Sequence, residues 1–237
     1  MESLQILALA LGAAWASGIN LYATATLLGV LNMVGVVPLP EEMQILSNPL
    51  VLAAAATLFF VEFLADKIPA VDSLWDAIHT FIRIPAGALM ALGAADGLGG
   101  EFLGEDLETV AALVMGGTLA ASSHLTKATS RAVINTSPEP FSNWFASFFE
   151  DFLAIGGVLL AIFNPLVFLG LLALFVLLAI WLVPKLWRVF RFLLSKVGIG
   201  SPPSEDIGTT IAPNGLVIRG RPAMGSHGGP PAKLDDQ

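Results

Sequence analysis

The sequence predicts an all-α fold, a polytopic membrane helix bundle with about six transmembrane helices. Of the 237 residues, 55% are hydrophobic and only 13% are charged, whereas about 25% of residues are charged in soluble domains. A membrane-spanning helix needs roughly 20 apolar residues, and apolar stretches near this length recur along most of the chain. Both observations indicate that lipid surrounds most of this protein.

Six apolar segments qualify as spans or nearly do: residues 3–36, 49–64, 84–95, 109–130, 144–163 and 165–183. The first is too long for a single span and is interrupted by the sequence SGIN at 17–20. Gly18 and Asn20 are therefore the candidates for a helix break. A helix over 71–83 comes before the third span, and it is predicted to be amphipathic because its charged and apolar residues fall on opposite faces at helical spacing.

The chain divides into two parts by composition. Residues 1–197 are predicted to form the transmembrane helical domain, and residues 198–237 a flexible tail. The tail begins where the sequence changes to Pro, Gly and Ser, a composition that buries too little apolar surface to offset the entropy of folding.

The charges between the spans predict the topology. Lys and Arg collect at one end of the predicted spans, at 67–83, 127–131 and 185–196. The connections at the other end hold only acids, namely Glu41, Glu42, Asp96, Glu101, Glu105, Asp106 and Glu108. Because basic residues accumulate in cytoplasmic loops, we expect a multi-pass protein of the plasma membrane or cell inner membrane with both termini in the cytoplasm.

Composition and motifs disfavour several classes of function. The chain has no cysteine, so it has no disulfide, no thiolate metal site and no cysteine nucleophile. The net charge of −8 argues against binding of nucleic acid, which needs a basic face. The sequence contains no HExxH, GxSxG or P-loop motif. We therefore predict no nucleic-acid partner, no cofactor, no metal site and no catalytic residue; the expected partners are the lipid bilayer and a small solute or lipid.

The densest set of charged residues lies at 62–87. On a helix over 71–83, one face carries Asp72, Asp76, His79 and Arg83. Two interpretations stay open: an interfacial helix whose polar face meets water, or a helix whose polar face lines a cavity between spans, where buried charge is paired or used. An Asp–Arg network explains the pattern as well as a metal site does.

Two further polar sets lie at the basic ends of the second and fourth spans. Glu62 and Asp66, one turn apart, either pair with neighbouring bases or bind a proton or cation. A shared helical face carries His124, Lys127 and Arg131, and it is either a basic patch at the membrane surface or an anion site that faces the acidic helix.

These polar sets should meet. We predict that the polar face of 72–83, the pair at 62 and 66 and the face at 124–131 converge in one cavity open to the cytoplasm, with SGIN as a hinge or gate. Arg83 should pair with a carboxylate, since an unpaired Arg is costly in lipid; Asp76, Glu62 and Glu150 are the candidates. Glu150 and Asp151 are adjacent at the start of the fifth span, so one can face inward while the other faces the headgroups.

Three stretches resemble a known family. They are SGINLYATATLLG (17–29), FLADKIPAVDSLWDAIHTFIRIPAGA (63–88) and NTSPEPFSNW (135–144), and they are similar to the bacterial membrane-protein family named domain of unknown function 4126 (DUF4126). The resemblance covers roughly residues 5–185 and leaves the tail out. It implies an integral membrane protein, and it implies no activity and no site residue.

Three functions fit the sequence. A transporter or channel-like protein for a small solute, ion or lipid headgroup is favoured by the intramembrane polar groups, the interrupted first span and a short internal likeness between PAVDSLW (69–75) and PEPFSNW (138–144). The alternatives are a membrane-embedded enzyme that acts on a lipid-borne substrate at the inner leaflet, and a non-catalytic scaffold. An enzyme needs carboxylates that converge at the interface, whereas a transporter needs polar groups that line a cavity within the membrane.

Overall fold

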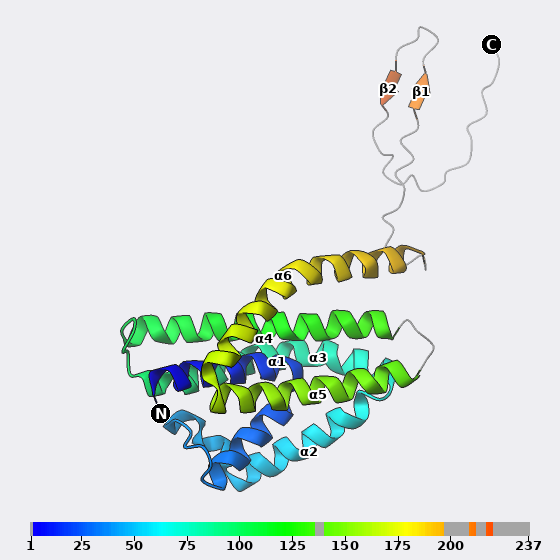
Figure 1. Cartoon of the computed structure of the whole chain (residues 1–237). Helices are drawn as coiled ribbons and strands as arrows, with labels where there is room; N and C mark the ends of the chain where they lie inside the picture. Colours follow the sequence, from blue (N-terminus) through cyan, green and yellow to red (C-terminus); the bar gives the residue numbers. More distant parts are fainter. Residues whose placement is uncertain (1, 136–139, 197–208, 212–216, 220–237) are drawn as a thin grey trace, which may run out of the picture. The chain divides into compact units, whose positions relative to one another are not determined.

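Six long α-helices make up most of the protein, of which the computed structural model describes residues 2–135, 140–196, 209–211 and 217–219 (Figure 1). The helices are α1 (Ser3–Met33), α2 (Pro49–Ala65), α3 (Pro69–Ala95), α4 (Glu105–Ile134), α5 (Pro140–Phe163) and α6 (Pro165–Lys196), with short 3₁₀ helices η1 (Glu41–Ser47) and η2 (Asp96–Leu98). This architecture confirms the predicted all-α polytopic bundle.

Prolines mark the starts of four helices. The first helical position is occupied by Pro49 in α2, Pro69 in α3, Pro140 in α5 and Pro165 in α6. Proline suits this position because its missing N–H would have no partner there and its φ is already helical. In α2 the preceding Asn48 adds an N-cap, since its side chain accepts a hydrogen bond from the Leu50 N–H at 3.0 Å.

The number of spans differs from the prediction of about six. Among the described residues, α1, α3, α5 and α6 are long and apolar enough to cross a membrane. The pair of η1 and α2, which meet at a bend of 66°, makes a fifth candidate if it is counted as one span. The helix that falls short is α4, because its second half carries polar side chains that are buried against other helices, including His124, Lys127 and Arg131.

The predicted amphipathic helix over 71–83 is the first half of α3, which continues through Pro85 to Ala95. Its polar face is turned into the protein, where each charged or imidazole side chain is at most 5% exposed: Asp72, Asp76, His79 and Arg83. Its apolar face is exposed, as is expected of side chains that meet lipid. The structure therefore contradicts the interfacial interpretation, in which the polar face meets water.

Helix α1 is broken at Asn20, whose φ of −145° and ψ of 98° are not helical. Both ends of α1 nevertheless lie at the same end of the bundle. Near the start of α1, Ser3 donates a hydrogen bond to Glu101, in the connection before α4. Beyond its end, Met43 of η1 lies against Gly93, near the end of α3. Figure 1 shows the second half of α1 turning back from the break, so α1 enters the bundle and returns.

The course of α1 places the N-terminus at the end of the bundle that holds the acidic connection at 96–104. Residues 66–68, between α2 and α3, lie at the opposite end. This differs from the prediction, which assumed a first span that crosses the membrane. The reason is local: a helix cannot run straight through a residue with the backbone angles of Asn20.

Small residues let α1, α3 and α4 approach closely. A Cβ on Gly18 of α1 would collide with the Ser123 hydroxyl and the Ala120 carbonyl of α4, and a Cβ on Gly87 of α3 would collide with the Ala120 side chain. Packing of this kind is typical of helices in lipid, where no hydrophobic effect drives association. The spanning window of α1 is 83% buried, against 17% for α6, so α1 forms the centre of the bundle.

Most of the tail predicted at 198–237 lies outside the described residues, so its predicted flexibility stays a prediction. Within it the structure describes two short strands, β1 (Thr209–Ile211) and β2 (Val217–Arg219), which pair antiparallel with Thr210 opposite Ile218.

Candidate functional site

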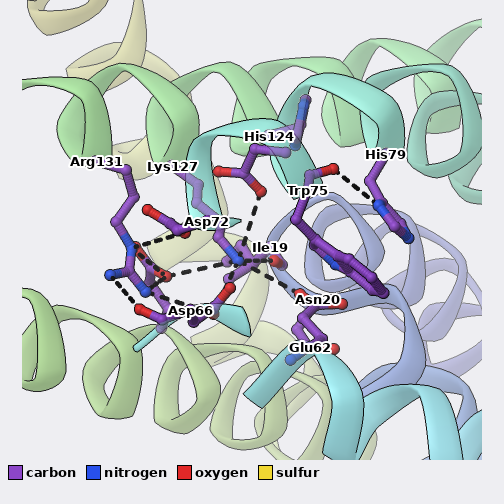
Figure 2. Close-up of polar contacts among 12 residues, drawn as sticks. Ile19, Asn20, Glu62, Asp66, Asp72, Trp75, His79, His124, Lys127 and Arg131 are labelled. Atoms are coloured by element: carbon purple, nitrogen blue, oxygen red, sulfur yellow. Dashed lines mark hydrogen bonds and ion pairs between the residues drawn. The ribbon is translucent and has the colours of Figure 1, made fainter. Parts of the chain in front are cut away.

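The polar sets singled out in the sequence come together inside the bundle (Figure 2). They come from the end of α2, the first half of α3 and the second half of α4, and α5 adds two carboxylates. Each residue is at most 9% exposed: Glu62, Asp66, Asp72, Asp76, His79, Arg83, His124, Lys127, Arg131, Glu150 and Asp151. We call these residues the charge network. It contains every residue predicted for the substrate or ion site.

Arg83 of α3 joins two carboxylates. Its Nη2 donates to Glu62 Oε1 of α2, and its Nη1 donates to Asp76 Oδ1, two turns earlier in α3, at 3.1 Å. The predicted pairing of Arg83 with Glu62 or Asp76 is therefore confirmed. The third candidate, Glu150, bonds to Arg131 instead.

Lys127 of α4 points into the middle of the carboxylates (Figure 2). Its Nζ lies 3.4 Å from Glu62 Oε1, 3.4 Å from Asp66 Oδ2, 3.6 Å from Glu150 Oε2 and 3.9 Å from Asp76 Oδ1. One ammonium group thus connects α2, α3, α4 and α5.

Arg131, one turn after Lys127, binds α5 in a fork. Its Nε and Nη2 each donate to one oxygen of Glu150 at 2.9 Å, the bidentate geometry that favours Arg over Lys. Its Nη1 donates to the side-chain oxygen of Asn143, whose own amide donates to the Asp66 carbonyl at 2.9 Å. Asp72 lies 3.9 Å from Arg131 Nε and accepts a hydrogen bond from Asn135 at 2.9 Å.

Acids outnumber bases in the charge network. The carboxylates are Glu62, Asp66, Asp72, Asp76, Glu150 and Asp151, against the bases Arg83, Lys127 and Arg131, which leaves an excess of three negative charges when all are ionised. Four of the carboxylates also have one buried oxygen without a hydrogen-bond partner in the described part of the chain: Glu62 Oε2, Asp66 Oδ1, Asp72 Oδ1 and Asp76 Oδ2. Buried, uncompensated charge is unfavourable, so the charge network has room for a further cation or hydrogen-bond donor.

The break in α1 lies against the charge network. Asn20 acts as the N-cap of the second half of α1, because its Oδ1 accepts a hydrogen bond from the Ala23 N–H at 2.9 Å. Its amide donates to Asp151 Oδ1 at 2.9 Å. At the end of the first half of α1, the Gly18 carbonyl lies 3.5 Å from Arg83 Nη1, and the Ile19 carbonyl accepts a hydrogen bond from Lys127 Nζ at 3.2 Å. A helix C-terminus carries partial negative charge, which favours a cation at this place.

The hydrogen bonds of His124 require a neutral imidazole. His124 Nδ1 lies 3.2 Å from Arg83 Nη1; since Arg only donates, this nitrogen accepts and has no proton. Its Nε2 then donates to Thr80 Oγ1 at 2.7 Å. His79 Nδ1 donates to the Trp75 carbonyl at 2.8 Å, and its Nε2 is hydrogen-bonded to the Tyr22 hydroxyl at 3.0 Å. His79 therefore links α3 to the second half of α1.

Lys67, between α2 and α3, lies at the edge of the charge network. Its Nζ donates to Ser147 Oγ at 2.7 Å and lies 3.7 Å from the centre of the Phe63 ring and 4.5 Å from that of Phe148. Burial against these groups lowers the pKa of the Lys67 amine, with nearby carboxylates acting in the opposite direction. The chain thus already holds one ammonium between phenyl rings.

The polar cavity predicted at this site takes a different form. The side chains of the charge network pack against one another, and the adjoining pocket of about 810 Å³ is mostly apolar. The pocket lies between α1, α4, α5 and α6, and two members of the charge network reach its wall, Lys127 and Glu150.

Some members of the site were missed or misjudged in the sequence. Asn143 bonds to the Arg131 guanidinium and Asn135 to the Asp72 carboxylate. Both lie in the stretch NTSPEPFSNW, whose amide side chains beside a span were the available signal. The expectation that Glu150 and Asp151 face opposite ways is wrong, because they are 9% and 8% exposed. Neighbouring residues on a helix can both be buried when other helices cover both directions, as α4 does for Glu150 and the α1 break does for Asp151.

Comparison with known proteins agrees with the resemblance noted in the sequence. The family model described as domain of unknown function (DUF4126) matches residues 7–185. This range covers α1 from its fifth residue, all of α2 to α5, α6 up to Lys185 and the whole charge network. No curated protein and no solved structure matches the chain. The family predicted from the sequence is confirmed: this chain belongs to the DUF4126 family.

Proposed function

We propose that this protein transports a small charged solute across the membrane, and that the transport is coupled to protons that bind to and leave the charge network. The observation that carries the proposal is the excess of buried carboxylates over bases beside the break in α1. A region with too few bases is stable in lipid only when protons or other cations make up the difference. Loss or gain of one proton would therefore change which ion pairs form.

The broken helix supports the same proposal. Many transporters place their sites at discontinuous helices, where the ends of the half-helices face ions and polar substrates. In α1, Asn20 connects the break to Asp151, and the Ile19 carbonyl connects it to Lys127. A change in the protonation of a carboxylate would thus reach the one backbone position in α1 that is already non-helical.

The alternatives are less well supported. An enzyme that acts on a lipid-borne substrate would need carboxylates open to the membrane surface, and the acidic residues of the charge network are all buried. A scaffold would have no use for a buried region with excess charge, which is costly to keep in lipid.

The proposal is tested with purified protein in liposomes that contain a pH-sensitive dye. Gradients of inorganic cations, organic cations and organic anions are applied in turn, and at least one class should change the internal pH. Asp76→Asn should slow this response at least about tenfold, because its amide can still accept from Arg83 but cannot exchange a proton. The exposed Asp106→Asn should leave the rate unchanged. If no class of solute moves protons through folded wild-type protein, the scaffold becomes the better explanation.

We further propose that the end of the bundle with Lys67 faces the cytoplasm and that the N-terminus lies on the opposite side. Buried bases in ion pairs are weak signals of topology. The half-buried Lys67 and the exposed Lys185, Arg188 and Arg191 are stronger ones, because basic residues accumulate on the cytoplasmic side. The acidic connection at 96–104 and the start of α1 then lie outside.

The absence of cysteine makes this orientation easy to measure by labelling single introduced cysteines with a membrane-impermeant maleimide. Glu2→Cys and Glu101→Cys should react from outside intact cells, whereas Ile68→Cys should react only after permeabilisation. Labelling of position 2 together with position 68, and not with position 101, would show that α1 crosses the membrane.

A further inference from the structure

We infer that the solute is a lipophilic organic cation, bound in the pocket between α1, α4, α5 and α6 with Glu150 facing its positive charge. The inference rests on the proposed function and names the class of substrate. Four observations carry it: the size and lining of the pocket, the position of Glu150, the sign of the charge behind it, and the way the chain holds its own Lys67.

The pocket has the size and surface of a site for an organic molecule. Its volume is about 810 Å³, within the range of roughly 300–1,000 Å³ typical of small-molecule sites. Six aromatic rings line it: Trp15, Phe145, Phe149, Phe152, Phe168 and Phe175. The faces of such rings attract cations, and most strongly where water is excluded.

The polar end of the pocket is where the charge network reaches the wall. Of its lining residues only Lys127 and Glu150 are charged, and the Lys127 ammonium is already surrounded by four carboxylates. The lining hydroxyls of Thr126 and Ser130 donate to carbonyls of their own helix at 2.7 and 2.8 Å. The Glu150 side chain is 11% exposed, more than that of any other carboxylate that pairs with these bases. Glu150 is therefore the group that a ligand meets.

The net negative charge of the charge network favours a cation as the ligand. The charge network has three more carboxylates than bases, and Lys67 at its edge reduces this excess only to two. An anionic headgroup in the pocket would add to the excess, whereas a cation reduces it. Lys67, held against Phe63 and Phe148 beside Ser147, is an example within the chain of how aromatic rings and a polar group bind an ammonium.

The same arrangement gives the coupling to protons. A cation beside Glu150 stabilises the ionised form of the nearby carboxylates, so a proton held by the charge network is released. One positive charge enters the buried region as another leaves it, and the net charge of the region is unchanged. The exchange is an antiport of one proton for one monovalent organic cation.

The test compares two ions of nearly the same shape and opposite charge, tetraphenylphosphonium and tetraphenylborate. Binding to the purified full-length protein in detergent is measured by equilibrium dialysis, and proton release is followed in weak buffer. Tetraphenylphosphonium should bind and release up to one proton per protein, and tetraphenylborate should do neither. Glu150→Gln should weaken tetraphenylphosphonium binding at least about tenfold, and Asp106→Asn should not.

A second variant guards against misfolding of Glu150→Gln. Ala146→Trp fills the pocket from α5 without removing any charge, and it should also weaken binding at least about tenfold. Equal or tighter binding of tetraphenylborate, or tetraphenylphosphonium binding that neither variant changes, overturns the inference. If another solute drives proton movement while tetraphenylphosphonium does not bind, the inference fails and the proposed function stands. If tetraphenylphosphonium binds without proton release, the pocket is right and the coupling is wrong.

Discussion

Replacing Arg83 with alanine should destabilise the folded protein by about 3–5 kcal/mol, the usual effect of removing one partner from a buried ion pair. Arg83 is fully buried and bonds to both Glu62 and Asp76. Without it, an excess of three negative charges becomes four, in a region that no solvent screens. Thermal unfolding in detergent, followed by size-exclusion chromatography, measures the effect.

Lys185→Ala is the matched control for Arg83→Ala. It also removes one basic residue, but Lys185 is exposed and its Nζ lies over the Trp181 ring, a contact with an expected stabilisation of about 0.5–1 kcal/mol. The pair of changes Arg83→Gln and Glu62→Gln should together cost less than the sum of the two alone, since each removes the charge that the other leaves unpaired. Equal unfolding temperatures for Arg83→Ala and Lys185→Ala would contradict the assignment of Arg83 to the charge network.

A methyl group at position 18 should be almost as damaging. In Gly18→Ala the added Cβ would collide with the Ser123 hydroxyl and with the Ala120 carbonyl of α4, and a backbone carbonyl cannot rotate away. We expect a loss of about 3 kcal/mol, at the upper end of the range for overpacking. The hydrogen bond from Ser123 to the Trp15 carbonyl, at 2.7 Å, would be disturbed as well. The melting temperature in detergent is again the measurement.

Gly170→Ala in α6 provides the comparison, because a Cβ there meets no atom within 4 Å. It should leave stability unchanged or raise it by up to about 1 kcal/mol through helix propensity. Ser123→Ala combined with Gly18→Ala should not restore stability, since the Ala120 carbonyl remains in place. A Gly18→Ala protein as stable as the wild type would mean that α1 and α4 lie further apart than described.

Much of the fold was predictable because hydropathy and capping act over short distances. Apolar stretches predicted the helices, and the prolines at 49, 69, 140 and 165 stand where four of them begin. The polar face of 71–83 was also visible, because helical spacing alone places Asp76 and Arg83 on one side. The sequence did not show whether that face points to water or into the protein, because an interfacial helix and a buried one share the same pattern.

The sequence by itself determined that this chain is a helical membrane protein of the DUF4126 family, which residues would be polar within it, and that Arg83 needs a carboxylate. Only the tertiary structure decided which carboxylates meet which bases, that Glu150 serves Arg131 rather than Arg83, and that α1 returns to the side where it starts. The physical reason is the distance along the chain over which each property acts. Hydropathy and helical spacing are properties of neighbouring residues, whereas the pairing of buried charges depends on groups from α2, α3, α4 and α5 that are up to 88 positions apart, from Glu62 to Glu150. Apart from Asp76 with Arg83 in α3, the ion pairs join different helices, and this pairing favours one arrangement of the helices in lipid.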